Sequence, residues 1–233
     1  HNQGNLLPVS SFPVDGTYPN ATTRYEKRNI ALSIPEWDTD ICIQCNKCIF
    51  VCPHACIRAK IYKQNDTLPS PAGFKFIPLK GKEPEPDMLY TIQVSYDDCT
   101  GCKLCVDVCP VEDKVKPEHK AINMKDIALL TSGEKKYFEH FINIPDYPRE
   151  KLKTNTVKFS QFLKPLFEFS GACSGCGETP YIRLVTQLFG DRTLIANATG
   201  CSSIYGGNLP TSPWAFDENG RGPGSSSQAL ARG

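Results

Sequence analysis

One cysteine pattern occurs twice in this chain, and it limits the possible folds more than any other feature. Each copy reads Cys-x2-Cys-x2-Cys-x3-Cys-Pro, and the two copies contain these cysteines: Cys42, Cys45, Cys48 and Cys52, then Cys99, Cys102, Cys105 and Cys109. This spacing is typical of proteins with two [4Fe–4S] clusters, in which the fourth cysteine of each run binds the other cluster. The three-residue steps let one tight loop reach three corners of a cubane. The proline, which has no N–H, then ends the local turn.

The spacing therefore predicts two clusters that share ligands between the copies. Cluster A is predicted to be bound by Cys42, Cys45, Cys48 and Cys109, and cluster B by Cys99, Cys102, Cys105 and Cys52. Zinc and disulfides are the alternatives for eight such cysteines. Zinc sites usually present paired Cys-x-x-Cys knuckles, and disulfides have no reason to repeat this register. The iron–sulfur interpretation is therefore favoured.

Composition narrows the class of protein further. A length of 233 residues allows one or two domains, and a net charge of +1 gives no reason to expect binding to nucleic acid or to a membrane surface. The sequence has no apolar run of about 18 residues, so we expect no transmembrane helix. Thiolates that must stay reduced favour a cytoplasmic protein. The start at His1, without Met or a signal segment, suggests the middle of a longer polypeptide or a processed product.

The chain around the two copies divides into a linker, strands and an insertion. Residues 1–25 contain scattered prolines and are expected to form an extended linker. Alternating apolar residues predict strands over 57–62 and 89–96. The proline-rich insertion 64–87, with a strand-like stretch at 74–79, is expected to contribute no ligand. Because its aromatic side chains need cover from water, we expect it to pack against another domain or subunit.

The later part of the chain has a different periodicity. A helix is predicted over 125–141, interrupted at Gly133, before prolines that mark a boundary near residue 150. An amphipathic helix is predicted over 178–189, with Ile182, Val185, Leu188 and Phe189 on its apolar side, and a short buried strand over 192–197. A helix followed by a strand is an α/β unit, unlike the preceding cysteine-rich part.

A second group of cysteines lies in this α/β part. Cys173 and Cys176 stand on a glycine-rich loop before the predicted helix, and Cys201 follows a predicted strand. Three cysteines do not complete a cubane, so a cluster with a ligand from elsewhere and a redox Cys-x-x-Cys motif are equally compatible with these residues. The twelfth cysteine, Cys56, is expected to be a buried structural thiol rather than an alternate ligand. Trp37 is expected to be a packing anchor, and His54 an ordinary residue.

Three unlike motifs, 169–181, 196–207 and 12–19, resemble pyruvate:ferredoxin (flavodoxin) oxidoreductases. The resemblance extends from residue 4 to about residue 223. It implies an α+β ferredoxin-like domain with two [4Fe–4S] clusters over 26–150. It also implies that 151–233 is the incomplete start of an α/β domain that binds thiamine diphosphate and Mg²⁺.

The same resemblance implies roles for the second cysteine group. Cys173, Cys176 and Cys201 would hold a third [4Fe–4S] cluster with a fourth cysteine from far downstream, and Glu178 and Cys201 would lie beside thiamine diphosphate. Glu178 could instead be a first-turn acid of the helix. The fourth cysteine and the segment that binds the diphosphate are absent from the sequence, so we expect the 233 residues to be catalytically incomplete, and we assign no catalytic residue.

The resemblance also implies a function. The complete enzyme would oxidise pyruvate with coenzyme A to acetyl-CoA and CO2, and this chain would carry the electrons to ferredoxin or flavodoxin. A homodimer is expected. A free-standing two-cluster electron carrier is one alternative, although such a carrier has no need of the second cysteine group. Part of an oxidoreductase for another 2-oxoacid is the other.

Overall fold

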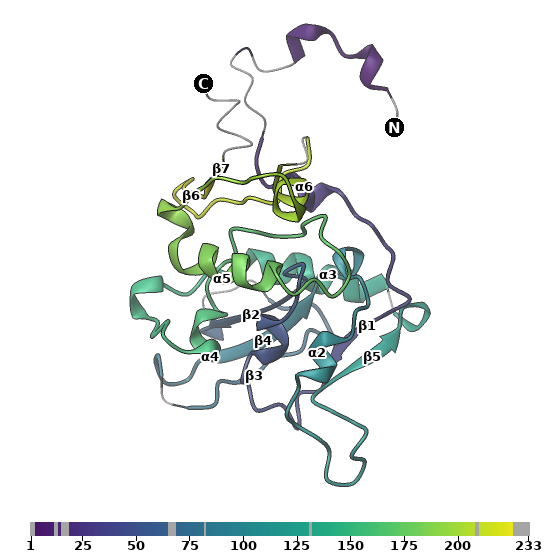
Figure 1. The fold of residues 1–233 in the computed structure, drawn as a ribbon. Coiled ribbons are helices and arrows are strands. Elements are labelled where there is room, and N and C mark those ends of the chain that lie inside the picture. The colour runs from purple at the N-terminus through teal and green to yellow at the C-terminus, as the bar shows by residue number, and fades with distance from the viewer. Residues whose placement is uncertain are drawn as a thin grey trace.

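The structure is a computed structural model, and it describes residues 3–11, 14, 19–64, 69–81, 83–130, 132–207 and 210–225. Most of the motif at 12–19 therefore lies outside the described residues. The cysteine-rich part forms the lower body in Figure 1, and the segment after residue 150 runs from α4 (Val157–Ser160), beside that body, to α5 (Thr179–Phe189) and α6 (Cys201–Gly207) above it. No helix among the described residues has both the length and the apolar character needed to cross a membrane.

The strands that flank one cysteine copy pair with the strands that flank the other copy. The first copy lies between β1 (Ser33–Trp37) and β2 (Ile57–Tyr62), and the second between β4 (Leu89–Val94) and β5 (Ile122–Asp126). The first strand of one copy pairs with the last strand of the other: β1 is antiparallel to β5, and β2 is antiparallel to β4. This exchange brings the end of each cysteine run to the start of the other.

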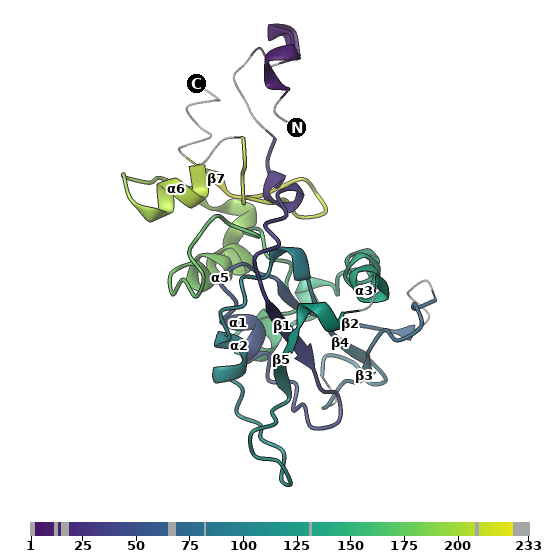
Figure 2. The ribbon, with the colours of Figure 1, turned by 90° about the vertical axis from the view of Figure 1, so that its right-hand side faces the viewer.

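Two short helices connect the cysteine loops to these strands. Helix α1 (Lys47–Phe50) and helix α2 (Leu104–Asp107) occupy matching positions in the two copies and contact each other. Figure 2 shows them together on one side of the β1–β5 pair. Strands and helices are thus mixed in an α+β arrangement, as the sequence predicts.

The insertion between β2 and β4 packs against α3 (Ser132–Asn143) and also contacts the segment after residue 150, where Lys153 pairs with Glu83 and Lys158 donates to the carbonyl of Lys80. It forms only the two-residue strand β3 (Ile77–Pro78), which pairs with β4. Phe74 is buried against Tyr137 and His140 of α3, with ring centroids 6.2 and 4.8 Å apart. The expectation that another domain or subunit covers Phe74 is therefore wrong, because α3 covers it.

The predicted helix at 125–141 is wrong in its start and in its interruption. Residues 122–126 form β5, because they pair with β1 at the edge of the cysteine-rich body. A 3-10 turn at Ile127–Leu129 follows, and α3 then runs through Gly133 without a break. Glycine is tolerated there because it lies in the first turn of the helix.

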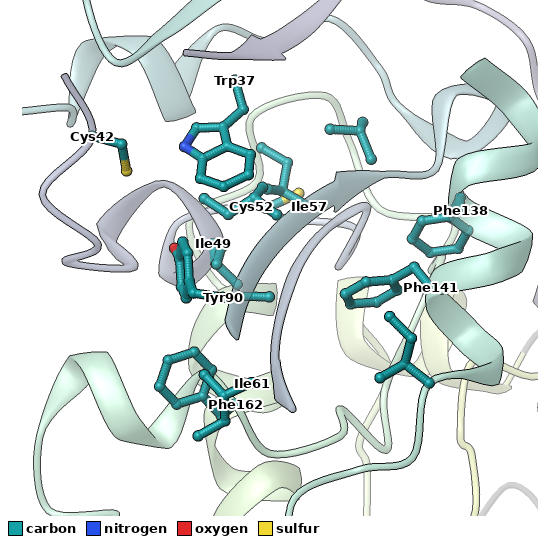
Figure 3. Close-up of a cluster of buried hydrophobic side chains, with 14 of the residues drawn as sticks. Trp37, Cys42, Ile49, Cys52, Ile57, Ile61, Tyr90, Phe138, Phe141 and Phe162 are labelled. Atoms are coloured by element: carbon teal, nitrogen blue, oxygen red, sulfur yellow. The ribbon is translucent and has the colours of Figure 1, made fainter. Parts of the chain in front are cut away.

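The core of the cysteine-rich body combines aromatic and aliphatic side chains and includes Cys42 and Cys52 (Figure 3). Trp37 is 4% exposed and meets the fully buried Tyr90 edge-on, at 5.6 Å between centroids. Phe162, after residue 150, meets the other side of Tyr90 at 6.0 Å. Helix α3 adds the stacked pair Phe138 and Phe141. The later segment therefore contributes to the same core as the cysteine loops.

The segment after residue 150 has little regular structure besides its helices. It contains α4 (Val157–Ser160), α5 (Thr179–Phe189), α6 (Cys201–Gly207) and the parallel two-residue strands β6 (Leu194–Ile195) and β7 (Gly224–Ser225). The helix predicted at 178–189 is confirmed. The buried strand predicted over 192–197 is wrong, because only two residues pair and Leu194 is 89% exposed.

Helix α5 turns its polar side inward. Arg183, Thr186 and Gln187 are buried, whereas Val185 and Phe189 are 45% and 49% exposed. The apolar periodicity thus predicts the helix correctly but its buried face wrongly. Hydrogen bonds explain the inversion, since Arg183 donates to the carbonyl of Cys52 in the cysteine-rich body and Gln187 donates to the carbonyl of Leu163.

Candidate iron–sulfur centres

Two small cavities in the cysteine-rich body each contain one of the predicted ligand sets. The first is lined by the cluster A set, Cys42, Cys45, Cys48 and Cys109, together with Trp37 and Tyr90. The second is lined by the cluster B set, Cys52, Cys99, Cys102 and Cys105, together with Cys56, His54 and Thr100. In both cavities the fourth cysteine comes from the other copy of the pattern. All twelve cysteines have free thiols in the structure.

The two cysteine loops have the same unusual backbone. Gln44 and Gly101 occupy equivalent positions and have left-handed φ of 59° and 66°, as do Asn46 and Lys103 with 61° and 66°. Left-handed geometry at these positions directs amide groups inward. The N–H of Gln44 donates to Cys42 Sγ at 3.4 Å, and the N–H of Gly101 donates to Cys99 Sγ at the same distance.

Side-chain bonds hold the strained loop of the first copy in place. A left-handed non-glycine residue costs about 1–2 kcal/mol. Gln44 offsets this cost, since its amide donates to the carbonyl of Pro78 at 2.8 Å and accepts from the N–H of Lys80 at 2.6 Å. Asn46 accepts from the Tyr90 hydroxyl at 2.7 Å and donates to the carbonyl of Lys158 at 2.7 Å. The shape of the loop thus depends on residues far away in sequence.

Burial disfavours thiolates in both cavities when no positive group is bound. Desolvation raises the pKa of Cys48 well above its usual range and that of Cys99 to about 12, and neighbouring thiols add to both effects. Cys52 is different. The Cys56 side chain hydrogen-bonds to it and is the main cause that holds the pKa of Cys52 well below its usual range. Cys56, 1% exposed, is therefore a buried thiol in contact with a predicted ligand.

Two buried donors at the cavities fit a bound cluster. The indole N–H of Trp37 and the hydroxyl of Thr100 are buried, neither meets an oxygen or nitrogen acceptor among the described residues, and the indole N–H faces the Cys42 thiol. Both residues line the cavities, and the Trp37 nitrogen points toward Cys42 in Figure 3. Buried polar groups in native proteins usually have partners. The sulfur atoms of a cluster would provide acceptors, so the residues present fit a [4Fe–4S] cluster.

The positions of the predicted ligand thiols in space favour a cluster over a single zinc ion. Within the described ranges, no three His, Cys, Asp or Glu side chains are gathered closely enough to hold one metal ion directly. A zinc ion needs its ligands about 2.0–2.3 Å away. A cubane is larger and binds each thiolate at a different corner, so its ligands do not converge on one point.

The third cysteine group lies against the loop of cluster B. Ser174, between Cys173 and Cys176, donates its hydroxyl to the carbonyl of Thr100 at 3.4 Å. Gly175, with φ of +73°, has its backbone so close to Cys102 that an added Cβ would lie 3.8 Å from the Cys102 Cβ. The fold thus brings this loop to the second cavity, a neighbourhood that sequence spacing does not indicate.

Tyr205 of α6 connects the remaining predicted residues of this region. Burial is the main cause that raises the pKa of its hydroxyl, and the nearby Glu178, Cys176 and Cys201 raise it further. Glu178 stands at the start of α5 but makes no side-chain capping bond. Cys173 and Cys201 are both exposed. Sequence reasoning missed Tyr205 because a lone tyrosine has no spacing signal.

A third cavity, of about 1030 Å³, is lined by none of the eleven predicted ligand cysteines. It lies between β2 and the segment after residue 150, and its lining includes Arg58, Lys60 and Glu168. Arg58 pairs with Glu168 at 2.5 Å. This cavity therefore adds no cysteine ligand to the predicted iron–sulfur centres.

Comparison with known proteins agrees with this geometry. Residues 41–112 match a family model described as a 4Fe-4S dicluster domain, and residues 1–31 match one described as a domain of unknown function, EKR. The chain is 55% identical to the pyruvate-flavodoxin oxidoreductase of Nostoc sp. over 95% of its own length and 18% of that relative. It is 53% identical to the probable pyruvate-flavodoxin oxidoreductase of Escherichia coli, over 94% and 19%. Identity to the pyruvate:ferredoxin oxidoreductase of Moorella thermoacetica is 49%, over 95% and 18%.

The fold and the family model together define an iron–sulfur protein with a ferredoxin-like [4Fe–4S] dicluster domain. Within that class, the chain is homologous to pyruvate-flavodoxin oxidoreductases, and the resemblance predicted from its motifs is confirmed. It spans about a fifth of the length of these relatives, 18% in the Nostoc protein.

Proposed function

We propose that this chain is the electron-transfer portion of an oxidoreductase that converts pyruvate and coenzyme A into acetyl-CoA and CO2. The oxidation releases two electrons, and each cluster carries one at a time, so the chain would deliver them singly to flavodoxin or ferredoxin. The observation that carries the proposal is the pair of cavities, each lined by one predicted set of four cysteines. A simple electron carrier is not favoured, because the relatives match over almost the whole chain.

The proposed ligands are Cys42, Cys45, Cys48 and Cys109 for cluster A, and Cys99, Cys102, Cys105 and Cys52 for cluster B. This assignment is supported by the exchanged strand pairing, which carries the fourth cysteine of each copy toward the other loop. The proposed boundaries are a linker over 1–25, the two-cluster domain over 26–150 and the start of a thiamine-diphosphate domain over 151–233.

Cys173, Cys176 and Cys201 are proposed to hold a third cluster together with a thiolate from another part of a longer polypeptide. The contacts of Ser174 and Gly175 with the cluster B loop support an order in which electrons pass from the third cluster to B and then to A. Helices α1 and α2, in contact with each other, connect the loops of A and B.

Glu178 and Cys201 are proposed to lie beside thiamine diphosphate, with Mg²⁺ on its diphosphate. When bound, this cofactor supplies the carbanion chemistry of 2-oxoacid decarboxylation. The support within this chain is the grouping of Glu178, Cys176 and Cys201 around the Tyr205 hydroxyl. This chain would contribute an acid–base and thiolate environment there.

Anaerobic reconstitution tests the proposal. The chain should take up about eight iron and eight sulfide into two stable clusters, which give reduced-state EPR signals. The third site alone should be empty or hold a labile cluster. The whole polypeptide should add a third cluster and reduce flavodoxin or ferredoxin with pyruvate. Stoichiometric zinc without iron would refute the iron–sulfur assignment. If the whole polypeptide holds two clusters but does not reduce flavodoxin or ferredoxin with pyruvate, a simple two-cluster electron carrier is the better interpretation.

A further inference from the structure

Arg183 is a buried cation that reaches from α5 to the turn between the two cysteine sites. Its side chain is 2% exposed. One terminal nitrogen donates to the carbonyl of Cys52 at 3.1 Å, and the other donates to the carbonyl of Phe50 at 2.7 Å and to Gln161 Oε1 at 3.0 Å. Its Nε has no partner among the described residues.

All the acceptors of Arg183 named above are neutral. In the described part of the chain, no carboxylate lies within salt-bridge distance of its guanidinium. The neighbouring Arg58 has a carboxylate partner in Glu168, and it repels Arg183. Taking an unpaired cation out of water is unfavourable, because the cation loses its hydration and gains no partner charge. Arginine stays protonated in proteins, so this charge needs a counter-charge from another source.

The predicted cluster ligands would supply the counter-charge once they bind iron as thiolates. Cys52, whose carbonyl accepts from the guanidinium at 3.1 Å, would then attract it, and so would Cys48. Cys48 is a predicted ligand of cluster A, and Cys52 is a predicted ligand of cluster B. The Phe50–Cys52 turn that Arg183 holds therefore connects the two sites. A cubane with four thiolates is negatively charged.

We propose that Arg183 is the buried counter-cation of the two clusters and raises their reduction potentials. This inference rests on the proposed function, since it needs the clusters to be bound. Reduction adds one negative charge to a cluster, and a fixed positive charge nearby stabilises the reduced state more than the oxidised state. Three hydrogen bonds also fix the position of the guanidinium relative to both ligands.

The inference explains why α5 buries its polar side. Helix α5 lies outside residues 41–112, the region that the dicluster model matches. The segment after residue 150 therefore supplies a charge that the dicluster region does not provide for itself. Arg183 acts through its field and its contacts with the turn, so it is a positioning residue and not a ligand.

Redox titration of the cluster-loaded, full-length polypeptide, followed by EPR, tests the inference. Arg183→Gln should keep both clusters but shift the potential of at least one of them to more negative values. Arg183→Lys, which keeps the charge, should recover most of that shift. Arg192→Gln is the matched control: it removes a charge just after α5, but the Arg192 side chain is 61% exposed and pairs with Asp191. Solvent screens the Arg192 charge, so the cluster potentials of Arg192→Gln should equal those of the unsubstituted protein.

Unchanged potentials in Arg183→Gln with both clusters loaded would overturn the inference, and so would an equal shift in Arg192→Gln. If Arg183→Gln fails to hold clusters, Arg183→Lys decides: potentials like those of the unsubstituted protein support the charge, and a clear negative shift refutes it. Absence of clusters from the unsubstituted protein would instead refute the proposed function, so the two failures can be told apart.

Discussion

Tyr90 connects the central strand β4 to the loop of cluster A, and its hydroxyl is the part that can be removed alone. The ring is fully buried between Trp37 and Phe162, and the hydroxyl donates to Asn46 Oδ1 at 2.7 Å. Asn46 has a left-handed backbone between Cys45 and Cys48. The substitution Tyr90→Phe keeps the ring and leaves the Asn46 oxygen buried without this donor.

The expected cost follows from that orphaned acceptor. A buried polar atom that loses its partner costs about 1–3 kcal/mol, and here little volume is lost to change the packing. For a chain of this length, 1 kcal/mol corresponds to roughly 2–4 °C in Tm. We therefore expect Tyr90→Phe to lower the unfolding midpoint by roughly 4–8 °C, for a cost of about 2 kcal/mol. Cluster A should also be lost sooner than cluster B.

Anaerobic thermal unfolding of the cluster-loaded protein, followed by circular dichroism, measures the effect. Tyr62→Phe is the matched control, because Tyr62 is 4% exposed and its hydroxyl has no partner among the described residues. Its removal should leave the midpoint unchanged or raise it. Equal midpoints for the two variants would refute the argument that the Tyr90 bond supports the loop.

Three further substitutions test separate parts of the site. Cys56→Ala should retain about eight iron, since Cys56 is interpreted as a hydrogen-bonding thiol and not a ligand; loss of half the iron would contradict this. Lys103→Gly should raise stability by about 1 kcal/mol in urea titrations by relieving the left-handed backbone, whereas Lys47→Gly within α1 should lower it by a similar amount. In a redox titration followed by EPR, Trp37→Phe should shift only the reduction potential of cluster A to more negative values, because it removes the N–H that points toward Cys42. A shift in the potential of cluster B instead would contradict that assignment.

The cysteine spacing was the most informative part of the sequence, because the two ligand sets it predicts line two separate cavities. Strand β2 is predicted at its observed bounds, since alternating residues 57–62 have one face in the core. The pairing of β5 with β1 could not be predicted from residues 122–126 alone. A pairing partner far away in sequence decides between strand and helix there.

Apolar periodicity failed at α5 for a physical reason. It assumes that the apolar side of a helix is buried, but backbone carbonyls of the Phe50–Cys52 turn and the carbonyl of Leu163 bind Arg183 and Gln187 instead. The roles of Arg183 and Tyr205 were likewise missed, because each depends on neighbours that only the fold brings close. Trp37 was correctly predicted to be a packing residue, but the direction of its N–H has no signal in the sequence.

Exchange of the fourth ligand between the two clusters is the central claim, and comparison of single-cysteine variants by EPR and iron analysis tests it most directly. Cys45→Ala and Cys102→Ala provide reference spectra for damage to cluster A and to cluster B. Cys52→Ala should lose about half the iron and give the spectrum of Cys102→Ala, and Cys109→Ala should give that of Cys45→Ala. If Cys52→Ala instead matches Cys45→Ala, each copy binds its own cluster and the account is wrong.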